Sequence, residues 1–160
     1  PDDPESDWPY VINVQRNIGP MGLPLTKPPY RRITAIDLNT GEHVWQTSFG
    51  KGPANHPLLE HLNLPDLGSV FTDVSAEGGI LITEGLVISH LPQKDEINED
   101  ADGSILVAYD KLTGDKVGEV TVDRRLHGPV MSYLSGGKQY IAIAGGRFDT
   151  AEMISFALPD

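Results

Sequence analysis

The stretch "AIDLNTGEHVW", residues 35–45, occurs a second time in altered form as "AYDKLTGDKVG", residues 108–118. In each copy an apolar strand pattern ends at an aspartate, a Thr-Gly turn follows, and a second strand pattern begins. In the first copy, Asp37 and Thr40 offer side-chain oxygens to backbone N–H groups, and Gly41 supplies the positive φ that ends the turn. The stretch therefore predicts an antiparallel hairpin that the chain uses twice.

The two copies differ at their last position, which is Trp45 in the first and Gly118 in the second. Trp45 falls on the returning strand, where its indole can wedge between neighbouring sheets and bury about 150 to 250 Å². Repeated units need such contacts because no unit buries both of its faces alone. We expect Trp45 to join two consecutive sheets, and the glycine to leave the following joint weaker.

Composition narrows the class of protein. The chain has 160 residues, 39% of them hydrophobic, which is enough for one domain with a sizeable core. A formal net charge of −11 argues against binding to nucleic acid or to anionic membrane surfaces. The absence of cysteine excludes disulfides, thiolate metal sites and a cysteine nucleophile. The chain starts at Pro1 without a methionine or a signal-like segment, so we expect a processed or truncated protein.

Strand patterns dominate the chain, and their grouping predicts an all-β fold. The proline-punctuated residues 1–30 form an irregular lead-in, and two strands follow. A long connection over residues 50–77 separates these from four further strands, and three more lie at the end. The two hairpin copies start 73 residues apart, more than the roughly 40 to 50 residues of a propeller blade. The long connection accounts for the surplus as an inserted loop, and the grouping is typical of a propeller cut within a blade.

The pattern Ala-x-Asp-x-x-Thr-Gly-x-x-x-Trp resembles the tryptophan-docking motif of quinoprotein dehydrogenases, which use pyrroloquinoline quinone (PQQ) in an eight-bladed β-propeller. The likeness is closest to the membrane glucose dehydrogenase branch and extends from about Gly22 to Pro159. It implies that residues 1–160 are the carboxyl-terminal part of such a propeller, about two to three blades of four-stranded antiparallel sheets. The stretches that carry it are "KPPYRRITAIDLNTGEHVWQ", "GGILITEGLVIS", "GPVMSYLSGGKQYIAIAGG" and "ISFALP".

The resemblance implies a function for the complete protein. A sugar or alcohol would be oxidised, with hydride passing to PQQ held near Ca²⁺ and electrons passing on to a quinone or a cytochrome. The protein would be periplasmic or secreted. The family's catalytic aspartate and calcium ligands come from earlier blades, so no catalytic residue is expected in this chain, which alone should be inactive. Its first partners would be the remaining blades, in the same or a separate chain.

A non-catalytic propeller fragment is the alternative. Such a fragment would serve as an assembly or interaction module, or would associate with copies of itself through exposed strand edges. Two departures from the family pattern favour it. Gly118 removes one docking tryptophan, and Glu77 stands where many relatives place an aromatic residue near the quinone.

Gly145, Gly146 and Arg147 follow the strand pattern "YIAIA" and form the first candidate cofactor-binding site. In the family, the residue after this Ala-Gly-Gly lies on the cofactor face, and glucose dehydrogenases commonly have histidine there. Arg147 would pair with a carboxylate of the quinone or with a substrate oxygen. The loop that follows is shorter than in the glucose dehydrogenases. An ordinary glycine turn with a solvated arginine is the alternative.

A second candidate cofactor-binding site is formed by Glu77, Gly78 and Gly79, at the start of another inner strand. Glycine there would let the backbone approach a planar cofactor. A plain strand-entry turn is the simpler interpretation. Lys27 is a further candidate cation, although a surface lysine explains it better.

Asn98, Asp100 and Asp102 have the spacing of a calcium loop, with Gly103 at the bend. Three oxygen-bearing side chains at alternate positions converge on one hard cation. The position where a bidentate glutamate is expected holds Tyr109, so a solvated acidic hairpin loop is the alternative.

The remaining motifs exclude other chemistries. None of the five histidines has the spacing of a zinc site, since His56 and His61 fall in a loose proline-bounded loop. The chain also lacks the Gly-x-Ser-x-Gly elbow, the phosphate loop and the dinucleotide fingerprint. Hydrolase and nucleotide-binding functions therefore have no residues to carry them.

Overall fold

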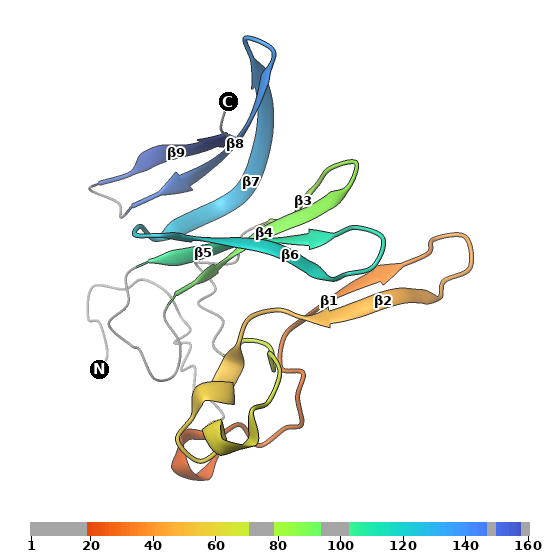
Figure 1. Ribbon diagram of the computed structural model, residues 1–160, viewed down its shortest axis with the longest axis vertical. Helices are drawn as coiled ribbons and strands as arrows, with labels where there is room; N and C mark the ends of the chain where they lie inside the picture. Colours follow the sequence, from red (N-terminus) through yellow and green to blue (C-terminus); the bar gives the residue numbers. More distant parts are fainter. Residues whose placement is uncertain (1–18, 71–78, 94–102, 147–149, 158–160) are drawn as a thin grey trace, which may run out of the picture.

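The computed structural model describes residues 19–70, 79–93, 103–146 and 150–157, which form three antiparallel sheets without an α-helix (Figure 1). Three short 3-10 turns precede or interrupt the connections: η1 (Pro20–Gly22), η2 (Gly52–Asn55) and η3 (Glu60–Leu62). None of these ranges contains a helix that is long and apolar enough to cross a membrane. The strands are β1 (Arg32–Ile36), β2 (His43–Ser48), β3 (Leu81–Ile82), β4 (Leu86–Pro92), β5 (Ser104–Asp110), β6 (Lys116–Val122), β7 (Leu126–Ser135), β8 (Lys138–Gly145) and β9 (Glu152–Ala157).

Each sheet is a simple meander of consecutive strands. The first sheet has the order β1-β2, the second β3-β4-β5-β6 and the third β7-β8-β9. The predicted grouping of two, four and three strands and the all-β class are therefore confirmed. In Figure 1 the sheets follow one another from the orange β1-β2 hairpin through the green and teal second sheet to the blue third sheet.

The two copies of the repeated phrase fold into hairpins of the same register. Ala35 pairs with Trp45, and the register then shifts by one residue. Ala108 pairs with Gly118 and is followed by the same shift. Position 118 is therefore the structural equivalent of position 45, which makes the exchange of tryptophan for glycine a local change in one joint.

The turn of the first copy forms the hydrogen bonds that its sequence predicts. The backbone N–H of Asn39 donates to a carboxylate oxygen of Asp37 at 2.8 Å. The backbone N–H of Glu42 donates to the hydroxyl of Thr40 at 3.2 Å. Gly41 has φ +74, a conformation that a side chain would strain.

The turn of the second copy repeats these bonds. Asp110 accepts from the N–H of Leu112 at 2.8 Å, and the hydroxyl of Thr113 accepts from the N–H of Asp115 at 3.2 Å. The hydrogen bonds that Asp110 accepts from the backbone N–H groups of Thr113 and Leu112 lower the pKa of its carboxyl. Gly114 ends the turn with φ +78.

Trp45 joins the first sheet to the second. Its indole nitrogen donates a hydrogen bond of 2.9 Å to the carbonyl oxygen of Lys111 in the turn of the second hairpin. A Cβ placed on Gly114 would lie 2.5 Å from the indole ring, so the ring covers that glycine directly. The indole also packs against the core between the two sheets, which consists of Ile33, Phe49, Val87, Leu91, Val107 and Tyr109.

A second core joins the second sheet to the third. Leu126 and Ile143 are completely buried in it, at 0% exposure. The hydroxyl of Ser104 accepts a hydrogen bond of 2.9 Å from the backbone N–H of Leu126, which connects the start of β5 to the start of β7. The other buried members are Ile88, Leu106, Val122 and Val130.

The long connection after β2 folds back on the entrance to β1. The backbone N–H of Phe49 donates to the carbonyl of Arg31, and that of Tyr30 donates to the carbonyl of Leu67, each at 2.9 Å. The N–H of Ser69 donates to the carbonyl of Phe49 at 2.8 Å. The described part of the connection is therefore tied to the first sheet, with two 3-10 turns as its only helical pieces.

Candidate functional site

The two predicted glycine sites meet at the start of β7. Gly79 lies against Pro129, since a Cβ on this glycine would be 3.0 Å from the proline Cβ. The N–H of Gly146 donates to the carbonyl of Arg125 at 2.9 Å. Nε2 of His127 donates to the carbonyl of Gly146, also at 2.9 Å. Two stretches that are far apart in the sequence thus converge on the first residues of one strand.

The chain's own packing requires glycine at two of these positions. A Cβ on Gly145 would lie 2.7 Å from Cδ1 of Ile154 in β9. Gly146 has φ +91, and a Cβ there would overlap the carbonyl oxygen of Thr150. Their close contacts are thus with β9 and with the turn that leads into it. A role for them in approaching a cofactor stays a prediction.

The other predicted site residues are not placed. Six of them lie outside the described residues, and their roles stay predictions: Glu77, Gly78, Arg147, Asn98, Asp100 and Asp102. Lys27 is described and is an exposed surface side chain, as its simpler interpretation predicts.

His90 is a buried polar residue that the sequence did not single out. Its side chain is 1% exposed, and its Nε2 donates to the carbonyl of Gly128 at 3.0 Å. Burial lowers the pKa of His90, and the electrostatic effect of the nearby basic side chains of His127 and Arg31 lowers it further, against the opposing effect of the hydrogen bond to Gly128. The ring is therefore neutral with its proton on Nε2. Its Nδ1 is buried and accepts no hydrogen bond from the described residues.

The hydrogen bonds of His90 and His127 fix the backbone around the start of β7. The register of β7 against β8 shifts between His127 and Met131, so a bulge lies at Gly128, which has φ +72. His90 fixes this bulge from the second sheet, while His127 fixes the turn at the end of β8. The spacing of the histidines does not fit a zinc site and gives no sign of this role. A better signal is Gly-Pro inside a strand pattern, since it marks a bulge whose carbonyls need partners.

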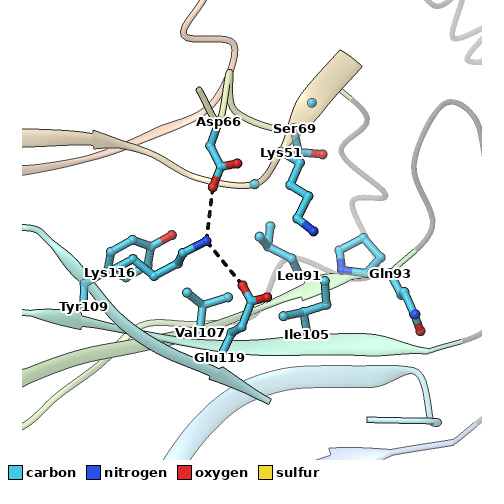
Figure 2. A pocket seen from close by; sticks show the side chains of 13 residues that line it. Lys51, Asp66, Ser69, Leu91, Gln93, Ile105, Val107, Tyr109, Lys116 and Glu119 are labelled. Atoms are coloured by element: carbon cyan, nitrogen blue, oxygen red, sulfur yellow. Dashed lines mark hydrogen bonds and ion pairs between the residues drawn. The ribbon is translucent and has the colours of Figure 1, made fainter. Parts of the chain in front are cut away.

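A separate pocket of about 60 Å³ lies between the second sheet and the long connection (Figure 2). The ammonium group of Lys116 bridges Asp66 of the connection, at 3.3 Å, and Glu119 of β6, at 3.4 Å. Burial disfavours the ammonium charge, but the two carboxylates outweigh this and raise the pKa of Lys116. Figure 2 shows Lys51 extending into the same pocket above an apolar floor of Leu91, Ile105 and Val107.

The ion pairs of Lys116 in this pocket anchor the long connection, and the pocket itself is too small to hold a sugar. Small-molecule sites have volumes of about 300 to 1,000 Å³, well above that of this pocket. Tyr109 in its wall is 3% exposed, and burial together with the charges of Asp66 and Glu119 raises its pKa to about 12. The phenol therefore stays protonated, and the bridge through Lys116 carries the polar interactions.

The family of the chain follows from comparison with known proteins. Residues 2–141 match the family described as "PQQ: Glucose/ethanol/alcohol dehydrogenase, beta-propeller domain". The chain belongs to this family. Its three sheets are consecutive parts of a β-propeller, and the predicted resemblance to quinoprotein dehydrogenases is confirmed.

Three relatives show the breadth of the family around this chain. It is 29% identical, over 98% of its length, to a probable quinate dehydrogenase (quinone) of Xanthomonas campestris pv. juglandis. It is 30% identical, over 95%, to quinoprotein glucose dehydrogenase A of Acinetobacter calcoaceticus. It is 32% identical, over 87%, to the glycerol dehydrogenase large subunit of Gluconobacter oxydans. The chain spans only 19%, 18% and 18% of the lengths of these relatives.

The family implies PQQ as cofactor, and Ca²⁺ is typical of it. When bound, PQQ supplies an acceptor for the two electrons removed from an alcohol carbon. The described residues contain no group of three or more histidine, aspartate or glutamate side chains that could hold a metal ion. Gly79, Gly145 and Gly146 make their close contacts with residues of their own chain.

Proposed function

We propose that the complete protein is a PQQ-dependent dehydrogenase that oxidises a hydroxyl group of a sugar or another polyol. The family match over residues 2–141 is the observation that carries this proposal. The relatives add the substrate class. Quinate, glucose and glycerol, the compounds in their names, are all small molecules with several hydroxyl groups.

In this proposal the chain supplies the carboxyl-terminal blades of a periplasmic propeller. The contact of Trp45 with the Lys111 carbonyl acts as the family's tryptophan docking between two blades. The remaining blades supply the aspartate base and the calcium ligands, and a quinone or a cytochrome accepts the electrons.

Arg147 is the residue of this chain that we place next to the cofactor. Support comes from its neighbour Gly146, whose N–H and carbonyl are both held, by Arg125 and His127. In this proposal Arg147 takes the position that the family places on the cofactor face, and PQQ carries carboxylates that a guanidinium pairs with well.

Binding of PQQ to the complete protein in the presence of Ca²⁺ tests the proposal. We expect a stoichiometric complex by native mass spectrometry, and reduction of the bound cofactor by at least one of quinate, glucose and glycerol. Arg147→Gln should weaken PQQ binding by about tenfold or more, because a charge-assisted pair is lost. Arg124→Gln is the matched control, since Arg124 forms an exposed pair with Glu152 at 3.0 Å and should leave PQQ affinity unchanged. A fully assembled protein that does not bind PQQ would overturn the proposal.

A non-catalytic assembly module is the second candidate. The glycine at position 118 favours it, because one joint between sheets lacks the tryptophan that a working propeller of this family would use. The same titration separates the two candidates. A module would assemble with the remaining blades, or with itself, and would show no PQQ-dependent change in mass or absorbance.

A further inference from the structure

Both stretches that the sequence marks as candidate cofactor sites contact one structural feature, the bulge at the start of β7. Gly79 lies against Pro129, since a Cβ on this glycine would be 3.0 Å from the proline Cβ. The carbonyl of Gly146 accepts a hydrogen bond of 2.9 Å from Nε2 of His127. Gly128, with φ +72, forms the bulge between His127 and Pro129. A movement of the bulge would therefore reach both stretches.

The second sheet holds this bulge through His90. Nε2 of this histidine donates to the Gly128 carbonyl at 3.0 Å, and its side chain is 1% exposed. Protonation would add an N–H group at Nδ1, a buried atom that has no hydrogen-bonding partner among the described residues. Because a buried charge without a partner is costly, the protonated ring would leave the joint between β4 and β7.

The surroundings of His90 add to this cost. Its cross-strand neighbour in β5 is the apolar Leu106. Among the described residues, the groups that act on it electrostatically are His127 of β7 and Arg31, which precedes β1, and both are basic. Burial has the largest effect, and the net result is a lowered pKa of His90. His127 differs, because it is half-buried and its Nε2 can donate to Gly146 whether the ring is neutral or charged.

We propose that the contact between His90 and Gly128 makes cofactor binding sensitive to pH, because the neutral ring holds the bulge in place and the protonated ring releases it. The contacts of Pro129 and His127 then carry the change to Gly79 and Gly146. The proposed function places PQQ beside the residue that follows Gly146, so this inference rests on the proposed function. It adds that binding of PQQ weakens in mild acid.

The affinity of the complete protein for PQQ, measured with Ca²⁺ between about pH 7.5 and about pH 5.5, tests the proposal. We expect the affinity to fall by up to about tenfold toward the acid end. At that end a released ring with the ordinary pKa of 6.5 is about ten times more often protonated than neutral. His90→Gln keeps a donor for Gly128 and cannot be protonated, so its affinity should stay nearly constant. His90→Leu lacks the donor and should bind PQQ weakly at both ends of the range.

His43→Gln is the matched control, since His43 is exposed, and this variant should retain the fall in acid. Hydrogen–deuterium exchange of the cofactor-free protein is a second measurement that needs no substitution, so it decides the question even if a variant does not fold. After correction for the intrinsic effect of pH on exchange, residues 126–130 at the start of β7 should lose more protection in acid than β1 does.

The outcomes separate this inference from the proposed function. A fall in affinity that His90→Gln removes, together with loss of protection at the start of β7, supports the role of His90. The same fall in His90→Gln as in the unsubstituted protein, or equal changes of protection in β7 and β1, would overturn this inference and leave the proposed function in place. Absence of PQQ binding even at neutral pH would overturn the proposed function, and the role of His90 in cofactor binding with it.

Discussion

The indole nitrogen of Trp45 and the carbonyl oxygen of Lys111 lie 2.9 Å apart, although 66 positions of sequence separate the two residues. This bond links the first copy of the repeated phrase to the turn of the second copy. It makes the joint between the first and second sheets depend on one side chain that offers both an apolar ring and a hydrogen-bond donor.

The two parts of this contact are separable by substitution. Trp45→Phe retains an aromatic ring and loses the donor, which should lower the free energy of unfolding by about 0.5 to 1.5 kcal/mol. Trp45→Ala also removes the ring from the core and should cost about 2 to 4 kcal/mol. Chemical denaturation measures both. Equal losses for the two variants would show that the ring itself contributes nothing.

Gly114 and Gly41 form a natural matched pair for the steric contact. Both have positive φ in the same turn, but a Cβ on Gly114 would lie 2.5 Å from the Trp45 ring, while a Cβ on Gly41 meets no atom within 4 Å. Gly41→Ala should cost about 1 kcal/mol for backbone strain alone. Gly114→Ala should cost clearly more and shift the fluorescence of Trp45. In the Trp45→Ala background the two alanine substitutions should become equal, and a difference that persists would contradict the contact.

His90 should make stability fall in mild acid. Its pKa in the folded chain is below the ordinary value of 6.5, so the folded state binds fewer protons than the unfolded chain when the pH drops below 6.5. The stabilisation by neutral His90 is complete above that pH and is lost progressively as the pH approaches the folded pKa. The basic side chains of Arg31 and His127, which act on it electrostatically, lower its pKa as well.

Unfolding measured from pH 7.5 downward, for example in steps of about half a pH unit, checks this expectation. His90→Gln keeps a donor for the Gly128 carbonyl and should flatten the decline. His43→Gln is the control, since His43 is exposed and its loss should leave the curve as it was. An unsubstituted chain whose stability is constant between pH 7 and pH 5 would rule out the buried neutral state.

Lys116 should matter more for the long connection than for global stability. Its pairs with Asp66 and Glu119 are about two-fifths exposed, so Lys116→Gln should cost no more than about 1 kcal/mol, and less at high salt. The connection should nevertheless be cut faster by a protease, because the bond between Asp66 and β6 is lost. Arg124→Gln also removes an exposed pair, remote from the connection, and should leave the cleavage rate unchanged.

The hairpins and the sheet grouping could be predicted because their causes are local. Asp37, Thr40 and Gly41 each supply a property that the turn needs, and the structure uses each as predicted. In the strands that follow, apolar and polar residues alternate clearly enough for the strands to be counted. The role of Trp45 between two sheets also followed from its place in a repeat.

The convergence at the start of β7 could not be predicted in the same way. It depends on distances between residues that the sequence keeps far apart, such as His90 and Gly128 or Gly79 and Pro129. Burial of His90 is a property of the joint between two sheets, and no spacing rule encodes it. The loss of the tryptophan at position 118 was visible in the sequence, but the surroundings of Gly118 depend on how the third sheet packs against the second.

The distance along the chain between Trp45 and its acceptor also has a consequence during synthesis. The first hairpin leaves the ribosome with its indole uncovered, and the carbonyl of Lys111 follows only after 66 further residues have been added. Over that interval the exposed ring can bind a chaperone or form a non-native contact, and the first hairpin cannot complete its native packing. The second hairpin has glycine at the equivalent position and emerges with no indole to protect.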